Sequence, residues 1–220
     1  MEQYFEILLA SPLFAGITKA ELSAMLGCLG TRVTQVNKGE PVFLEGDAAG
    51  FFGMVLSGHI QVVRDDFYGN RSVLTYAEPG ELFAEAFACA GSAVMPVSAY
   101  ALKDSRVMLF SCQKMLTVCS SACDFHNKLV KNLLTVVAQR NLNLSSKIQV
   151  MSRKTTREKL LAYLSEQAKK AGSEEFTVPF DRQALADYLG VERSAMSAEL
   201  SKLRRDGILD TKGAWFHLYS

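Results

Sequence analysis

The sequence predicts an α+β fold: an N-terminal antiparallel β-roll of jelly-roll type, one long helix, and a small C-terminal domain. Turn signals containing glycine recur about every ten residues between 31 and 109, a spacing typical of all-β domains. Residues 124–151 contain neither Gly nor Pro, which favours an unbroken helix. From residue 176 onward the pattern is a short strand over 176–180, followed by helix, glycine, helix and hairpin. We therefore expect domains at 1–123 and 153–220, joined by a helix over 124–152.

Composition sets broad limits on the class of protein. Of the 220 residues, 49% are apolar, which is enough for a packed core, and the formal net charge of +1 gives no indication of the partner. No basic segment precedes an apolar one, so we predict no signal peptide, and the longest uncharged run, 86–102, is too short to cross a membrane. We expect a cytoplasmic protein with no membrane partner, whose five cysteines are reduced.

The first 30 residues are expected to form short helices that lead into the roll. Thr18 and Glu21 have the spacing of a capping box, which would start a helix carrying Leu22 and Met25. Within the roll, the β-branched runs 60–64 and 72–76 flank a Gly-Asn turn and predict a hairpin.

The long helix carries two apolar faces and therefore needs two partners. We expect one face to pack on the roll and the other on the same helix of a second copy, giving a homodimer. The alternative is a helix buried within one subunit. The first stripe comprises Val130, Leu133, Val137, Leu144, Ile148 and Met151, and the second comprises Leu129, Leu134, Val136 and Leu142.

The C-terminal pattern predicts a winged helix-turn-helix. Thr155 and Glu158 form a second capping box, and Asp181 is expected to cap a helix that ends at the tight turn of Gly190. A second helix is expected over 192–205, followed by a two-stranded wing over 208–218 after Gly207. Helix, turn, helix and hairpin is the winged helix-turn-helix arrangement.

In such an arrangement the second helix places its N-terminal polar face in the major groove of double-stranded DNA. An arginine there can bind guanine through O6 and N7, whereas later cations bind phosphates. The alternative is that these are solvated side chains of a protein-interaction module. The residues expected to face bases are Arg193, Ser194, Ser197 and Ala198, and those expected at phosphates are Lys202, Arg204, Arg205 and Lys212.

Over nearly its whole length the chain resembles the CRP/FNR family of bacterial regulators. The matching segments are 39–47, 56–62, 79–85 and, most specifically, 181–197. The resemblance implies a β-roll sensor domain, a dimerisation helix, and effector-dependent binding to palindromic promoter DNA, with RNA polymerase as a further partner. It implies a transcriptional regulator and not an enzyme.

Departures from the family pattern affect the expected effector. Glu85 stands where the cyclic-AMP-binding members carry the Glu that holds the ribose, but Ala84 replaces the preceding Gly. Met95 and Pro96 stand near the Arg that holds the cyclic phosphate, so we do not expect cyclic AMP bound in the usual way. We expect a less charged small molecule instead, the alternative being that these side chains simply pack the roll. The expected effector site comprises Phe83, Ala84, Glu85, Met95, Pro96, Val97, Leu142 and Asn143.

The recognition helix departs from the pattern as well. Arg193 agrees with the family, but Ser194 and Ala198 stand where the cyclic-AMP-type members carry a Glu and an Arg. We therefore do not expect the half-site of those members here.

The cysteines and histidines predict no metal site and no cofactor beyond the effector. The iron–sulfur members carry a cysteine cluster before the roll, where this chain has only Cys28. We expect buried structural thiols, with redox sensing as the alternative. Two other classes of protein stay open: a cupin-like metal-binding enzyme, and a DNA-binding or protein-interaction module that needs no ligand. The remaining cysteines are Cys89, Cys112, Cys119 and Cys123, and the histidines are His59, His126 and His217.

Overall fold

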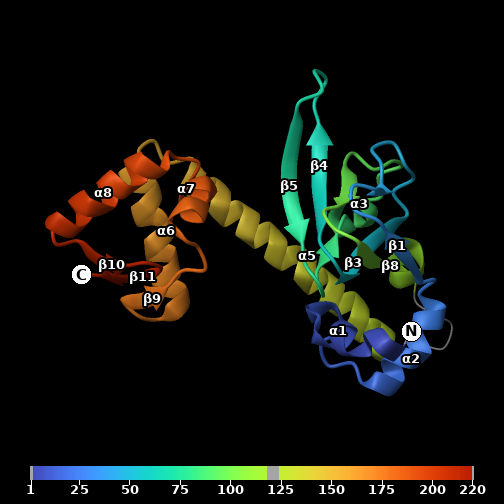
Figure 1. The fold of residues 1–220 in the computed structure, drawn as a ribbon. Helices are drawn as coiled ribbons and strands as arrows, with labels where there is room; N and C mark the ends of the chain where they lie inside the picture. Colours follow the sequence, from blue (N-terminus) through green and yellow to red (C-terminus); the bar gives the residue numbers. More distant parts are fainter. Residues whose placement is uncertain (1, 118–123, 220) are drawn as a thin grey trace. The chain divides into compact units, whose positions relative to one another are not determined.

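The structure, a computed structural model, describes residues 2–117 and 124–219. Its contacts divide the chain into two compact units, Met1–Gln139 and Arg140–Ser220 (Figure 1). The division falls inside the long helix α5 (Asp124–Met151), so the last turns of α5 pack with the second unit. The expected domain bounds, close to residues 123 and 153, stay a prediction.

Short helices precede the sheets, as the sequence predicts. They are η1 (Glu2–Tyr4), α1 (Phe5–Ala10), η2 (Pro12–Phe14) and α2 (Lys19–Cys28). The capping box that starts α2 is confirmed: the Thr18 hydroxyl accepts the Glu21 N–H, and the Glu21 carboxylate accepts the Thr18 N–H. Leu22 and Met25 of α2 are buried in the core of the first unit.

Two four-stranded antiparallel sheets form the roll, which confirms the predicted fold (Figure 1). One has the order β1-β8-β3-β6 and the other β2-β7-β4-β5. Their facing apolar side chains make one core with the N-terminal helices. The strands are β1 (Arg32–Val36), β2 (Pro41–Phe43), β3 (Phe51–Ser57), β4 (Ile60–Asp65), β5 (Arg71–Ala77), β6 (Leu82–Phe83), β7 (Ser98–Ala101) and β8 (Ser105–Ser111).

The predicted hairpin is the β4–β5 pair, which projects from the roll in Figure 1. Its turn is held by the Asp66 carboxylate, which accepts the N–H groups of Tyr68 and Asn70 at 2.8 and 2.9 Å. These hydrogen bonds hold the pKa of Asp66 below its usual value, the contacts with Asn70 being the largest cause.

Two short helices in the first unit have no counterpart in the sequence predictions. They are α3 (Glu85–Cys89) and α4 (Cys112–Leu116). The segment that forms α3 is rich in alanine and begins without a side-chain cap, so it carries none of the usual helix-start signals.

The part of α5 in the first unit packs on the roll with residues drawn from both predicted stripes. Leu129 and Leu133 are buried there, and Val136 and Val137 pack against the same core. Leu134 is 66% exposed. The face of α5 that packs on the roll therefore takes Leu133 and Val137 from the first predicted stripe. It takes Leu129 and Val136 from the second.

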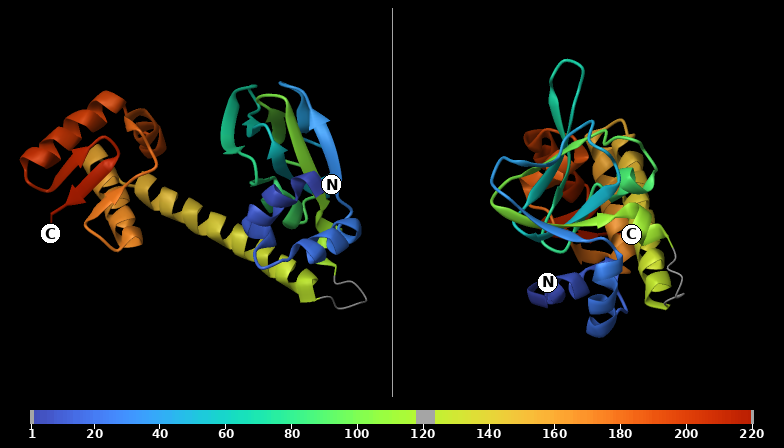
Figure 2. Two further views of the ribbon diagram at one scale, coloured as in Figure 1. Left: turned by 60° about the horizontal axis from the view of Figure 1, so that its bottom comes forward. Right: turned by 90° about the vertical axis from the view of Figure 1, so that its right-hand side faces the viewer.

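The second unit is a three-helix domain with a small sheet of order β10-β11-β9 (Figure 2, left). Strand β9 ends at Thr177, short of the predicted residue 180, because Pro179 has no N–H to continue the ladder. The elements after α5 are α6 (Thr156–Ala171), β9 (Glu175–Thr177), α7 (Arg182–Leu189), α8 (Arg193–Arg205), β10 (Leu209–Lys212) and β11 (Trp215–Leu218). Among the residues that the structure describes, no helix is both long enough and apolar enough to span a bilayer.

Candidate nucleic-acid interface

The turn between α7 and α8 fixes the geometry of the candidate interface. The Asp181 carboxylate caps α7 by accepting the Ala184 N–H at 2.8 Å, as predicted. Gly190 then adopts φ +58° and ψ +49°, a left-handed conformation that glycine reaches without strain. The Val191 N–H bonds back to the Ala186 carbonyl at 3.0 Å, so the chain enters α8 directly.

Helix α8 separates a buried face from an exposed one. Met196, Leu200 and Leu203 are at most 4% exposed and join the core of the second unit. The opposite face of the first turns is exposed and lies outside the core. It consists of Arg193, Ser194, Ser197 and Ala198, the residues that the sequence predicts will face bases.

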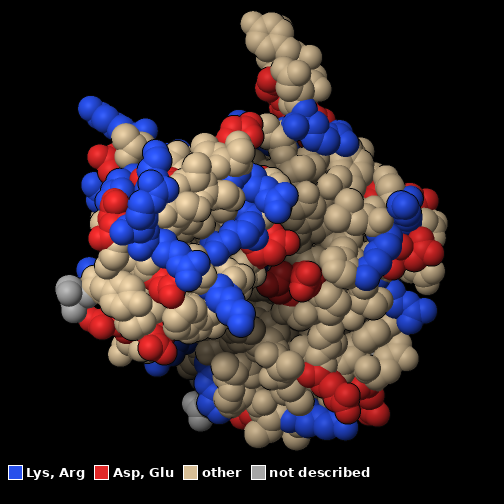
Figure 3. Space-filling view, turned by 60° about the vertical axis from the view of Figure 1, so that its left-hand side comes forward, with Lys and Arg blue, Asp and Glu red and all other residues tan. Residues whose placement is uncertain are grey.

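The cations of this unit fall into two groups. Lys202 pairs with Glu199 at 3.4 Å, and Arg204 pairs with Asp210 at 2.9 Å. Within the described part of the chain, no ion pair engages the side chains of Arg193, Arg205 or Lys212. Figure 3 shows several Lys and Arg side chains gathered close together, with a few Asp and Glu among them.

Arg157 of α6 supports helix α8 through its guanidinium, a role that the sequence did not reveal. Its guanidinium donates to Glu199 at 3.2 Å and to Asp206, the C-terminal cap of α8, at 3.1 Å. These partners raise the pKa of Arg157, Asp206 being the largest cause. The contact also neutralises two carboxylates close to the basic residues of α8. No sequence signal could reveal it, because Glu199 lies 42 residues from Arg157.

Arg182 of α7 holds the wing and was also missed. Its Nη2 donates to the Thr211 hydroxyl at 2.7 Å, and its guanidinium lies over the Phe216 ring at 5.1 Å from the centroid. Burial lowers the pKa of Arg182. The Thr211 hydroxyl in turn donates to the Trp215 carbonyl at 2.8 Å, so one arginine ties α7 to both wing strands.

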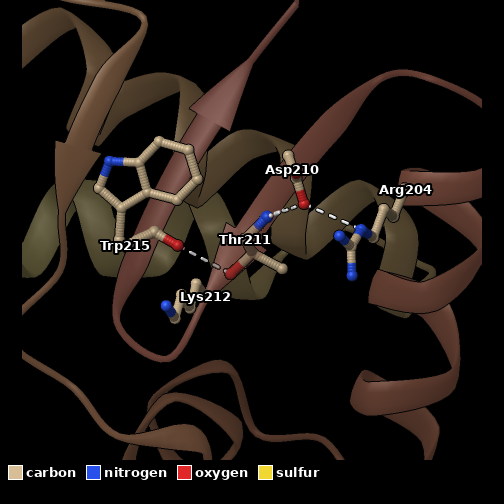
Figure 4. A pocket seen from close by; sticks show the side chains of 5 residues that line it. All are labelled: Arg204, Asp210, Thr211, Lys212 and Trp215. Atoms are coloured by element: carbon tan, nitrogen blue, oxygen red, sulfur yellow. Dashed lines mark hydrogen bonds and ion pairs between the residues drawn. The ribbon is translucent and has the colours of Figure 1, made fainter.

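A shallow pocket lies between α8 and the wing (Figure 4). On one side, Asp210 accepts both from Arg204 and from the Thr211 N–H, which lies at 2.7 Å. Lys212 points away from this pair. Arg204 is therefore engaged within the protein, whereas Lys212 extends to solvent.

The last turns of α5 are built into this unit. Val150 is 3% exposed in its core, and the Lys147 ammonium lies over the Tyr188 ring at 5.1 Å from the centroid. A Cβ on Gly190 would stand 2.6 Å from Cε of Met151. The end of α5 is thus in contact with the turn that precedes α8.

In the first unit, the predicted effector residues are mostly core side chains. Phe83, Met95 and Val97 are at most 2% exposed, and Pro96 is half-buried. The Phe83 ring covers Gly53 so closely that a Cβ on Gly53 would lie 2.0 Å from the ring. This burial agrees with the alternative that these side chains simply pack the roll.

The loop before α3 holds the polar part of the predicted effector site. Ala84 has φ +62°, the one positive φ among described residues other than glycine. Glu85 follows it and is 2% exposed. Leu142 and Asn143 fall in the second unit and are exposed, so their part in the predicted effector site stays a prediction.

Comparison with known families agrees with both units. Residues 33–122 match the family model of the cyclic nucleotide-binding domain, and residues 158–218 match that of the Crp-like helix-turn-helix domain. The two matches cover most of the chain, in the order that the CRP/FNR resemblance predicts.

The chain belongs to the CRP/FNR family of transcriptional regulators.

Two curated relatives of this CRP/FNR regulator match most of its length. The cyclic AMP receptor protein of Thermus thermophilus is 23% identical over 199 residues, which are 90% of this chain and 88% of that protein. The transcriptional activator protein anr of Pseudomonas aeruginosa is 21% identical over 188 residues, 83% of this chain and 75% of that protein.

Solved structures share the fold of this CRP/FNR chain. That of DNR from Pseudomonas aeruginosa has a TM-score of 0.54 and 21% identity, covering 100% of this chain and 95% of that one. The catabolite activator protein of Thermus thermophilus has a TM-score of 0.51 and 22% identity, covering 95% of this chain and 94% of that one.

The described residues of this CRP/FNR regulator contain no cluster of potential metal ligands. Among them, no group of three or more His, Cys, Asp or Glu residues is placed to hold a metal ion. Cys112 is buried as expected, whereas Cys28 is exposed. Cys119 and Cys123 lie outside the described residues.

Proposed function

We propose that this regulator binds a palindromic double-stranded DNA site as a homodimer, and that a small effector in the roll sets its affinity. The observation that carries the proposal is the exposed face of α8, where Arg193 stands without an ion-pair partner among the described residues. A guanidinium that has no such partner is available to bind O6 and N7 of guanine. The hydroxyls of Ser194 and Ser197 flank it and can reach a base or a phosphate.

The remaining cations would fix the position of α8 on the duplex. Arg205 and Lys212 are exposed and free of ion pairs in the described chain, so they are suited to phosphates. Lys202 and Arg204 would have to exchange their carboxylate partners for phosphates, which makes them weaker contacts. Ala198 would contribute an apolar contact, such as one to a thymine methyl group.

The dimer is supported by apolar side chains of α5 that no core covers among the described residues. A row of exposed leucine and isoleucine side chains on one helix is typical of a helix–helix interface. Pairing α5 with the α5 of a second copy would cover them and give the two recognition helices the twofold symmetry of a palindrome. The exposed residues are Leu134, Leu142, Leu144 and Ile148.

The effector is proposed to bind near the loop before α3. Glu85 would offer a buried carboxylate directly after Ala84, where the backbone is left-handed. Met95 and Pro96 supply no cation for a cyclic phosphate, so the ligand is expected to be less charged than cyclic AMP. Contributions from Leu142 and Asn143, and a contact with RNA polymerase, stay predictions.

Selection of bound duplexes from a random pool tests the proposal. We expect an inverted repeat whose half-sites lie about one or more helical turns apart, that is, about 34–36 Å or a multiple. Repeating the selection with added cell metabolites tests effector dependence, because a ligand that prefers one state must shift DNA affinity. Recovery of unrelated sequences, or of a single half-site bound by a monomer, would contradict the proposal.

A further inference from the structure

Two cysteines that are distant in the sequence meet where α3 ends and α4 begins. Cys112, the first residue of α4, donates its thiol hydrogen to Sγ of Cys89, the last residue of α3, at a sulfur–sulfur distance of 3.4 Å. Cys112 is buried and Cys89 is half-buried. The sequence gives no sign of this contact, because 23 positions separate the two residues.

The surroundings allow the two sulfurs to come closer. A disulfide bond is about 2.0 Å long, so the sulfur atoms must approach each other by about 1.4 Å. Cys112 continues from strand β8, whose neighbouring side chains are buried in the core. Cys89 packs against the edge of this core and is followed by the exposed segment 90–94, so we expect the movement to fall on the end of α3 rather than on β8.

The chemistry of the pair keeps it reduced under mild conditions. Burial raises the pKa of the Cys89 thiol to about 12, and the hydrogen bond with Cys112 and the charge of Glu85 act in the same direction. A thiolate, the reactive form, is therefore rare at Cys89 at neutral pH. An oxidant must be strong or persistent to react with such a pair.

We propose that Cys89 and Cys112 form a reversible intramolecular disulfide when the protein meets a peroxide, and that this bond fixes α3. In the first step one thiol sulfur attacks a peroxide oxygen, the O–O bond breaks, and a sulfenic acid and water form when the peroxide is hydrogen peroxide. In the second step the other thiol sulfur attacks the sulfenic sulfur and a second water leaves. Both sulfurs are oxidised, the peroxide is reduced to water, and a dithiol reductant reverses the bond.

Fixing α3 would act on the loop that precedes it. Helix α3 has only five residues and begins at Glu85, directly after the strained Ala84. A bond at Cys89 therefore restrains the whole helix and the position of the Glu85 carboxylate. That this restraint reaches the effector rests on the proposed function; the bond itself does not.

Disulfide mapping tests the bond. A full-length chain with Cys28, Cys119 and Cys123 replaced by Ser retains only the pair. After treatment with hydrogen peroxide and alkylation of free thiols, we expect one linked peptide joining Cys89 to Cys112, which disappears with dithiothreitol. Cys89→Ser in the same background should give none. If the triple substitution prevents folding, the same mapping on the unaltered chain identifies the link by mass.

Hydrogen exchange tests the restraint. In the oxidised protein we expect amide exchange across residues 85–90 to slow at least threefold, with exchange in the second unit unchanged. Alkylation of both thiols after peroxide treatment, or links only between chains, would overturn the proposed bond. A linked pair with unchanged exchange in α3 would overturn the proposed restraint. Neither readout requires DNA, so failure of DNA binding is distinguishable from failure of this inference.

Discussion

The α8 face and the loop before α3 are both candidate binding sites, and they are built in opposite ways. On α8 the candidate side chains are exposed and lie across the helix from the core; they are Arg193, Ser194, Ser197 and Ala198. Around the loop, Phe83, Met95 and Glu85 are themselves buried. A partner as large as a duplex needs side chains on a convex surface, whereas a small molecule is enclosed by residues that also pack the fold. In a sequence, helical periodicity therefore distinguishes the exposed residues of the α8 face from core residues. No such pattern distinguishes the buried residues around the loop from the rest of the core.

The largest expected effect tests whether Phe83 belongs to the core. Phe83→Ala should lower the free energy of unfolding of the first unit by about 3–5 kcal/mol, because it removes a ring that packs on Gly53 and Phe43. Urea unfolding by circular dichroism would measure it. The fluorescence of Trp215, the only tryptophan, follows the second unit separately and should be little changed. A loss under about 1 kcal/mol would instead place Phe83 in an open pocket.

The next effect concerns base recognition by α8. Arg193→Ala should weaken binding to the selected site by about 10- to 100-fold and remove the preference for one base pair in each half-site. Binding to unrelated duplexes should change little, and fluorescence anisotropy would measure both. Lys170→Ala is a matched control, since this cation pairs with Glu166 within α6. Equal losses on specific and unrelated DNA would contradict the role of Arg193 in base recognition.

A smaller effect tests whether Lys212 contacts a phosphate rather than a base. Lys212→Ala should weaken binding evenly on all sequences, because a phosphate contact carries no base information. A plot of log affinity against log salt concentration should lose about one unit of slope, as expected for one neutralised phosphate. An unchanged slope would show that Lys212 does not touch the backbone of the duplex.

The smallest effect concerns the strained loop. Ala84→Gly should stabilise the first unit by about 0.5 kcal/mol, because glycine adopts φ +62° without steric cost although it gains freedom in the unfolded chain. Urea unfolding would detect the shift, with Ala86→Gly as a control in a helical position that should destabilise. Destabilisation by Ala84→Gly would mean that the Cβ of Ala84 contributes more by packing than it costs in strain.

Local patterns were sufficient to predict the second unit and most of the roll. Helix caps at Thr155 and Asp181 and the turn at Gly190 act within a few residues, so the sequence reveals them directly. The antiparallel roll followed from the spacing of its turns. Strand β9 was predicted too long because Pro179 cannot continue its ladder. Helix α3 was missed because its short segment has no side-chain cap, and α4 was missed although Ser111 caps it, because it is only five residues long.

Contacts between distant segments could not be predicted. Arg157 meets Glu199, and Arg182 meets Thr211, only after the helices and the wing have packed. The pairing of Cys89 with Cys112 likewise depends on where β8 brings α4. Each arises from tertiary packing, and a single sequence contains no record of such proximity.

The continuity of α5 into the second unit has a geometric consequence. Residues 140–151 are anchored there by Val150 and by Lys147 over Tyr188, while the helix continues without a break from residue 124. In an α-helix each residue advances the chain by about 100° around the axis. Adding one residue between 147 and 150 would therefore turn the Lys147 ammonium by about 100° away from the Tyr188 ring if Val150 kept its place in the core. The spacing of these two residues thus decides whether both anchors of the helix end can act at once.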